Sequence, residues 1–279
     1  MGKNLQKCGS SIKNNVKHTI MIGGLSNNGI EKEFEFWAAH DVDFIMLSVA
    51  YDFFLNREKI SEALRLKDKY SLNLLIHPRP DGNIFQTPAN IEAHSIMLDS
   101  LDKIRDIIYQ NGLINKLILH LSSCRLPGNN FRTFSEEEAI SNSLLFYKHL
   151  RQFNDLTFVF ENVYPPGIGW EELGYVPEHF SIFNLPKNSE FCLDTGHLKL
   201  STMNMSDIFR LPYKITCLHL HSNNGRSDQH IPLTRQNFHE WREVEEILTY
   251  DKYIVLEVKN ELDKVKNTIE YIKKNQIAP

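Results

Sequence analysis

Short apolar runs alternate with longer amphipathic runs along nearly the whole chain. The short runs are rich in β-branched and aromatic residues, which predicts buried strands. They fall at residues 18–24, 43–51, 72–78, 116–122, 156–163, 190–196, 215–222 and 253–259. The amphipathic runs predict helices at 30–40, 57–70, about 88–110, from Ser135 onward, near 205–211, at 235–248 and at 261–274. Eight β/α units in strict alternation predict an α/β fold, a single (β/α)8 barrel of the TIM type.

The same pattern predicts one domain. Residues 18–279 form the barrel and residues 1–17 are a polar N-terminal leader. A doubly wound sheet is the alternative fold, but no Gly-rich dinucleotide or phosphate-binding fingerprint follows any predicted strand. Within the barrel, Ser135 with Glu138 three residues later has the spacing of a helix capping box. The connection 164–187 is rich in Pro and Gly and only weakly helical.

Composition narrows the choice of partners. The net charge of −4 with neutral histidines provides no general attraction for nucleic acid or for an anionic membrane, although a local basic patch is compatible with it. No apolar run has the length of a membrane span, and the N-terminus lacks the apolar stretch of a signal peptide. Four cysteines are present, and Cys192 and Cys217 lie inside predicted strands. We therefore expect reduced thiols, a cytoplasmic location and no membrane partner.

Ionisable residues concentrate at the ends of the predicted strands. Six consecutive strands carry one each: His77, His120, Glu161, Asp194, His219 and Glu257. Strand ends converge on one face of a barrel, where barrel enzymes have their active sites. Any one of these residues could be structural, for instance a helix cap. Carboxylates and imidazoles at six consecutive strand ends together indicate a metal site.

Further candidates lie close to these strands. Strand alternation along 215–222 places Cys217, His219 and His221 on one face, so we expect His219 to point inward. His221 lies nearer the rim, where it could support the site or bind substrate. Three more candidate ligands lie on predicted loops: His197, Asp228 and His230. Asp228 and His230 are spaced so that an extended segment could bring both onto one ion.

Three segments together resemble a known superfamily. FVFENV (158–163), EFCLDTGH (190–197) and LHLHSNNGRSDQH (218–230) are similar to the xylose-isomerase-like TIM barrel superfamily, which includes sugar phosphate isomerases and epimerases. Within it, the chain most resembles the endonuclease IV type, the AP endonuclease family 2. CLDTGH is close to that family's Cys-Ile-Asp-Thr-Cys-His, and the Asp-x-His of 228–230 is a second match.

The resemblance implies up to three divalent ions per chain, most simply zinc, with manganese as the alternative. His77 and His120 would bind the first ion, and Glu161 would bridge it to a second. Asp194, His219 and Glu257 would complete the second site, and His197, Asp228 and His230 the third. The chain departs from the family where loops contact DNA: His120 is followed by Leu-Ser-Ser instead of Pro-Gly, and His221-Ser222 replace Asn-Asp.

Two enzyme functions follow from these residues. The first is a metal-dependent hydrolase of a phosphoester, in which Glu161 and Glu257 are catalytic and Arg79, Arg125 and Arg226 bind phosphate. Its substrate would be small, because the net charge does not support binding of nucleic acid.

The alternative is an isomerase or epimerase of a sugar or sugar phosphate with a single ion at Glu161, Asp194, His219 and Glu257. A third possibility is a barrel that binds a ligand without turnover. Four aromatic residues that look exposed could serve such a role, or wall a pocket, or pack between helices: Phe53, Phe54, Tyr164 and Trp170.

Overall fold

The computed structural model of the protein describes residues 20–27, 29–79, 87–124, 134–165, 172–233, 252–259 and 264–275. Outside these residues lie the predicted leader, the predicted helix 235–248, and the side chains of Arg125 and Trp170.

Eight parallel strands close into a barrel, as the sequence predicts. In order around the barrel they are β1 (Ile20–Ser26), β10 (Lys252–Leu256), β9 (Ile215–Leu220), β8 (Glu190–Asp194), β6 (Thr157–Glu161), β4 (Lys116–Leu119), β3 (Asn73–Arg79) and β2 (Phe44–Ala50). The ring closes because β1 pairs in parallel with both β2 and β10. All eight strands therefore direct their carboxyl ends to the same rim.

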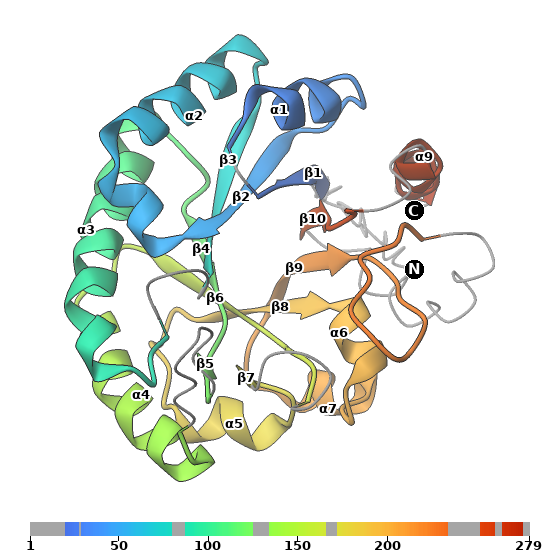
Figure 1. Cartoon of the computed structure of the whole chain (residues 1–279). Coiled ribbons are helices and arrows are strands. Elements are labelled where there is room, and N and C mark those ends of the chain that lie inside the picture. The colour runs from blue at the N-terminus through green and yellow to red at the C-terminus, as the bar shows by residue number, and fades with distance from the viewer. Residues whose placement is uncertain are drawn as a thin grey trace, which may run out of the picture.

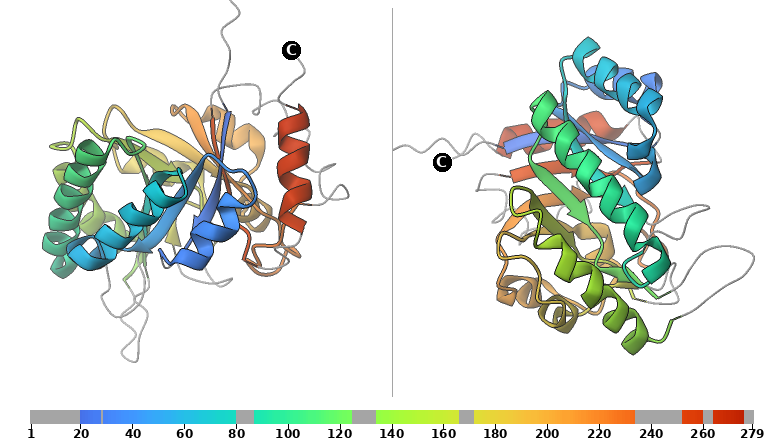
Figure 2. Two further views of the ribbon diagram at one scale, coloured as in Figure 1. Left: turned by 90° about the horizontal axis from the view of Figure 1, so that it is seen from above. Right: turned by 90° about the vertical axis from the view of Figure 1, so that its left-hand side faces the viewer.

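Helices surround this ring (Figure 1). They are α1 (Glu31–Ala38), α2 (Arg57–Lys69), α3 (His94–Asn111), α4 (Glu136–Leu150), α5 (Pro177–Ile182), α6 (Thr195–Leu200), α7 (Met205–Arg210) and α9 (Val265–Asn275), with short 3-10 turns η1 (Tyr51–Leu55) and η2 (Ile91–Ala93). Figure 2 shows α9 standing along the flank of the barrel beside the strands. A small antiparallel pair, β5 (Ser122–Ser123) with β7 (Glu172–Leu173), forms from the connections that follow β4 and β6.

Local sequence explains where several helices start and stop. The Ser135 hydroxyl accepts a hydrogen bond from the Glu138 amide at 3.1 Å, so the predicted cap of α4 is confirmed. Asn56 caps α2 in the same way. Gly112 ends α3 with φ of 57°, a left-handed conformation that glycine adopts without steric cost.

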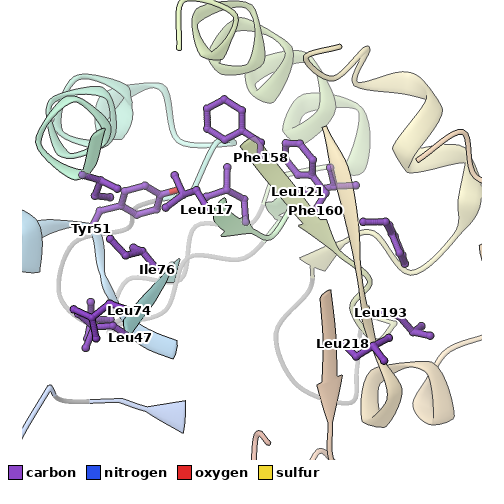
Figure 3. Packing of buried hydrophobic residues seen from close by; sticks show 14 of the residues in the cluster. Leu47, Tyr51, Leu74, Ile76, Leu117, Leu121, Phe158, Phe160, Leu193 and Leu218 are labelled. Atoms are coloured by element: carbon purple, nitrogen blue, oxygen red, sulfur yellow. The ribbon is translucent and has the colours of Figure 1, made fainter. Parts of the chain in front are cut away.

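Strand alternation divides the apolar core into two parts. Side chains inside the barrel form a cluster that includes Phe44, Met46, Ile118, Cys192 and Cys217. The alternate residues of the same strands face outward against the helices. Figure 3 shows this outer part, with Leu47, Leu74, Ile76, Leu117, Phe158, Phe160, Leu193 and Leu218 among its members. Cys192 and Cys217 are buried free thiols, as predicted for strand residues.

Two of the aromatic residues considered for ligand binding belong to this outer core. Phe53 and Phe54 lie in η1 and are 7% and 2% exposed, so the view of them as exposed residues was wrong. They pack edge to face with each other, with ring centroids 5.5 Å apart. Their role is packing, which the sequence analysis offered as one of its alternatives.

Candidate metal centre

The six predicted strand-end residues converge at the carboxyl rim of the barrel. His77 lies in β3, Glu161 and Asp194 end β6 and β8, and His219 lies in β9. His120 directly follows β4, and Glu257 directly follows β10. All are buried except His120, whose side chain is 15% exposed. The prediction that consecutive strands bring these groups to one place is confirmed.

One nitrogen of His219 forms the centre of this arrangement. Its Nδ1 lies 3.1 Å from Glu161 Oε2, 3.3 Å from Glu257 Oε1 and 3.8 Å from Asp194 Oδ2. Ligand atoms of Glu161, Asp194 and His219 all lie within 4.8 Å of one another, close enough to share one ion. Three carboxylates that converge on one buried nitrogen repel one another, so the arrangement is costly unless a cation compensates their charge.

A second group of ligand atoms adjoins the first. His77 Nε2 and His120 Nε2 lie 3.6 Å and 3.7 Å from Glu161 Oε2. The same Glu161 oxygen thus faces both groups, as expected for a carboxylate that bridges two ions. His120 Nδ1 lies 2.7 Å from Glu172 Oε2, and this carboxylate fixes the orientation of the imidazole ring.

The expected third set, His197, Asp228 and His230, divides between two groups that both include His221: ligand atoms of Asp228 and His230 lie within 4.8 Å of His221, and those of His197 lie within 4.8 Å of Asp194 and His221. His230 Nε2 lies 2.6 Å from Asp228 Oδ2, and His197 Nε2 lies 3.7 Å from the same oxygen. His197 was expected on a loop, and this was wrong: it lies in α6, where its amide donates to Asp194 Oδ1 at 2.6 Å. His230 has φ of 49°, which is strained for a residue with a side chain. Such strain is often found at functional sites.

Three histidines present their ring nitrogens in the same way. In each, Nδ1 is within hydrogen-bond distance of a backbone carbonyl: His77 with Ile118 at 3.1 Å, His197 with Asn162 at 3.0 Å, and His230 with Glu257 at 2.8 Å. A proton on Nδ1 leaves the lone pair on Nε2, which faces the carboxylates. This tautomer is the one that binds metal ions through Nε2, with the carbonyl orienting the ring.

Electrostatics and unpaired atoms also fit a divalent ion. Burial opposes ionisation of Glu161, but the surrounding imidazoles, His219 first, lower its pKa well below the usual range and keep it ionised. Burial lowers the pKa of His77, which favours its neutral ring, whereas at His197 and His219 the neighbouring carboxylates outweigh burial and raise the pKa of the ring. Among the described residues, Glu161 Oε2 and both ring nitrogens of His219 are buried without a hydrogen-bond partner. The donors are N and O atoms, which suit zinc or manganese.

The predicted substrate-binding residues have different surroundings. Arg79 lines a cavity of about 250 Å³ that opens over the groups of candidate ligands. Arg226 is exposed and is not part of that lining. His221 directly follows β9, so it lies near the rim as expected, and it is fully buried there, with Nε2 3.0 Å from Asp194 Oδ2 and Nδ1 3.6 Å from Asp228 Oδ1. These contacts fit the supporting role, one of the two that the sequence analysis offered for it.

Several residues of the site were not predicted from the sequence. Asn162 holds the end of β8 through its side chain, accepting from the Asp194 amide at 2.8 Å and donating to the Asp194 carbonyl at 2.9 Å. Its position next to Glu161 was the available signal. Others enter the cavity lining from distant segments: Asn27, Ser48, Glu172 and Lys259. Tyr164 also lines the cavity, in agreement with one of the roles proposed for it.

Comparison with known proteins finds similarity in the fold and not in the sequence families. No protein-family model matches the sequence, and no curated protein matches it. In the described part of the chain, no helix is long and apolar enough to cross a membrane.

Solved structures do match over nearly the whole chain. A D-tagatose 3-epimerase-like protein has a TM-score of 0.68 and 17% identity, covering 91% of this chain and 97% of that one. A D-psicose 3-epimerase from Clostridium cellulolyticum has a TM-score of 0.67 and 11% identity, covering 92% and 100%. Endonuclease IV from Thermus thermophilus has a TM-score of 0.55 and 13% identity, covering 91% and 99%.

The two sugar-epimerase-type structures have higher TM-scores than endonuclease IV, the type to which the sequence analysis gave most weight, and at this level of identity the scores compare the fold alone. Further sugar epimerases also match. The fold is thus shared by both kinds of enzyme. The chain has the fold of the xylose-isomerase-like superfamily of TIM barrels.

Proposed function

We propose that the protein is a divalent-metal-dependent isomerase or epimerase of a small sugar, with the ion held by Glu161, Asp194, His219 and Glu257. The convergence of three carboxylates on His219 Nδ1 carries this proposal. Two of the carboxylates, Glu161 and Glu257, also line the cavity and so can reach a bound molecule.

The cavity favours a small polar substrate. At about 250 Å³ it is smaller than pockets for drug-sized ligands, which begin at about 300 Å³. Polar residues such as Asn27, Ser48 and Lys259 contribute to its walls and can hydrogen-bond to hydroxyl groups. The overall charge of −4 also favours a small substrate over long nucleic acid.

The two glutamates are arranged for proton transfer at carbon. Glu161 ends β6 and Glu257 follows β10, and β8 and β9 separate these strands in the barrel. The carboxylates therefore approach the cavity from different directions, so one can remove a proton from one face of a carbon while the other returns a proton to the opposite face. When bound, the divalent ion would polarise a carbonyl oxygen and acidify the adjacent C–H group.

Similar structures support this reading. Of the best-scoring matches described above, one is a D-tagatose 3-epimerase-like protein and the other is a D-psicose 3-epimerase solved with D-tagatose. Inversion next to a ketone carbonyl requires stabilisation of the carbonyl oxygen and transfer of a proton on each face of the carbon, and this chain has residues that would hold an ion for the first task and carboxylates for the second.

A phosphoester hydrolase is the second candidate, and the additional ligand groups favour it. A single ion does not need all of the candidate ligands. Two further pairs have ligand atoms within 4.8 Å of a neighbouring candidate: His77 with His120, and Asp228 with His230. Two or three ions could generate a hydroxide and stabilise charge on the attacking and leaving oxygens of a phosphoester. Arg79 at the cavity wall is compatible with a phosphate group in this reaction.

Proton exchange tests the proposal. The protein, loaded with manganese or zinc, is incubated in deuterated water with a panel of ketoses and their phosphates, and NMR follows deuterium at the carbon next to the carbonyl. We expect incorporation and an epimeric product for at least one sugar, and loss of both in Glu161→Gln and in Glu257→Gln. Cleavage of bis(p-nitrophenyl) phosphate without any deuterium incorporation would favour the hydrolase.

A further inference from the structure

Two polar side chains lie next to each other in the wall of the cavity over the candidate metal centre. Asn27 directly follows β1, Ser48 lies in β2, and both line the cavity. Two residues earlier on the same strands, Leu25 and Met46 are register partners that face the interior of the barrel. Since side chains alternate along a strand, Asn27 and Ser48 occupy the next pair of inward positions, where the apolar interior gives way to the cavity.

This pair lies in the half of the barrel that does not hold the proposed ion. The four residues proposed to bind the ion come from four neighbouring strands, β6, β8, β9 and β10. Asn27 and Ser48 belong to the other half, which β1, β2, β3 and β4 form. Ser48 stands opposite Asp194, because three strands separate β2 from β8 in either direction around the barrel. A molecule bound at the ion through one end therefore directs its other end towards Asn27 and Ser48.

The hydrogen-bonding groups of both side chains are available to a ligand. Ser48 is only 2% exposed, and its hydroxyl makes no hydrogen bond within the part of the chain that the structure describes. Asn27 Oδ1 is buried and likewise has no hydrogen-bond partner among the described residues. Buried polar groups in folded proteins are nearly always paired, because an unpaired one loses its hydrogen bonds to water without replacement. Two such groups side by side in a cavity wall indicate a bound partner.

The contrast with another polar residue of the wall indicates what kind of partner this is. Glu172 is occupied by His120, with 2.7 Å between Oε2 and Nδ1, and so belongs to the support of the candidate metal centre. Asn27 and Ser48 make no such contact with any described residue. Their side chains donate and accept hydrogen bonds without carrying a charge, and sugar hydroxyl groups do the same. The pair is therefore suited to the hydroxyl groups of a sugar.

We propose that Asn27 and Ser48 bind the hydroxyl groups at the end of the sugar that points away from the ion, and so determine which sugars the protein accepts. This inference rests on the proposed function. With the carbonyl oxygen at the ion, the hydroxyl groups on the carbons farthest from the carbonyl reach this pair. A sugar too short to reach Asn27 and Ser48 leaves their polar groups unpaired, so the pair selects longer ketoses over short ones.

Binding measurements on the metal-loaded full chain test the proposal. The probes are the ketohexoses D-fructose, D-psicose, D-sorbose and D-tagatose, and the short ketose D-erythrulose, which is two carbons shorter. Ser48→Ala and Asn27→Leu each remove the hydrogen-bonding group with little change in the size of the side chain. Ser100→Ala is the matched control, because Ser100 is a buried serine of α3 that does not line the cavity. NMR titration gives a dissociation constant for each sugar, and elemental analysis checks that all proteins hold the same amount of metal.

We expect the ketohexose that wild type binds most tightly to bind about threefold to tenfold more weakly to Ser48→Ala and to Asn27→Leu, as for the loss of one hydrogen bond, and to bind Ser100→Ala as it binds wild type. D-Erythrulose should bind all four proteins alike, whereas general damage to the site would weaken long and short ketoses equally. Equal weakening of both kinds of sugar, unchanged ketohexose affinity in both variants, or no ketohexose binding to wild type would overturn the proposal.

Deuterium exchange, measured as described for the proposed function, separates the two claims. Exchange by wild type together with unchanged ketohexose binding in Ser48→Ala and Asn27→Leu would refute the role of this pair and leave the proposed function standing. Selective weakening of ketohexose binding in the two variants, without exchange in any sugar, would count against the epimerase or isomerase reaction and support the role of Asn27 and Ser48 in binding.

Discussion

Gly196→Ala is expected to disrupt the site through His221. Gly196 lies in α6, directly against the imidazole of His221, and a Cβ built at Gly196 would lie 2.0 Å from Cε1 and 2.3 Å from Nδ1 of that ring. The ring cannot move outward, because it is fully buried and stacks on His230 with centroids 4.2 Å apart. One added methyl group must therefore push His221 away from Asp194, 3.0 Å from its Nε2.

Two contributions determine how far Gly196→Ala lowers the free energy of unfolding. Overpacking of a well-packed interior costs about 1–3 kcal/mol. Loss of a hydrogen bond between a buried carboxylate and an imidazole costs about 1.5–3 kcal/mol. We therefore expect Gly196→Ala to lower the free energy of unfolding by about 2.5–6 kcal/mol and to reduce the metal content of the protein.

A double-mutant cycle with His221→Ala isolates the steric cause. Once the ring is removed, Gly196→Ala should cost less than about 0.5 kcal/mol, because Ala is the better helix former and Gly196 has no positive φ. Denaturant unfolding of the wild type, both single variants and the double variant gives the coupling energy. An equal cost of Gly196→Ala in both backgrounds would refute the reasoning.

Three further predictions concern the ligand groups. Glu161→Ala should abolish turnover and lower metal content while circular dichroism shows a folded barrel; full turnover of this variant would contradict a catalytic role. The double variant Asp228→Ala/His230→Ala should lower the metal-to-protein ratio by one in elemental analysis if the protein is a multinuclear hydrolase, and should leave it unchanged if a single ion serves an epimerase. Glu172→Gln should weaken metal binding by about tenfold or more through misorientation of His120, measured by competition with a chelator, and unchanged affinity would exclude the orienting role.

The fold and much of the site were predictable from periodicity. Alternation along β9 directs Cys217 and His219 into the barrel, and the barrel topology then brings His219 together with Glu161 and Asp194. These relations depend on the two-residue period of a strand and on the common direction of parallel strands, which sequence alone reveals.

The remainder depended on contacts that no local pattern encodes. His197 belongs to a helix of only six residues that Asp194 caps through its side chain, too short to produce a periodic signal. Glu172 reaches His120 because β7, in the connection after β6, pairs with β5, in the connection after β4. His221 is fully buried at the rim because Gly196 leaves space for its ring, a contact between two segments that the sequence does not reveal.

The central claim is that Glu161, Asp194, His219 and Glu257 hold a divalent ion. Anomalous diffraction from crystals of protein purified without chelator, collected on both sides of the absorption edge of the metal found by elemental analysis, tests it most directly. We predict an anomalous peak about 2.0–2.2 Å from His219 Nδ1 and from oxygens of the three carboxylates. A fully loaded protein whose anomalous peaks all lie elsewhere, with none among these four side chains, would contradict the account.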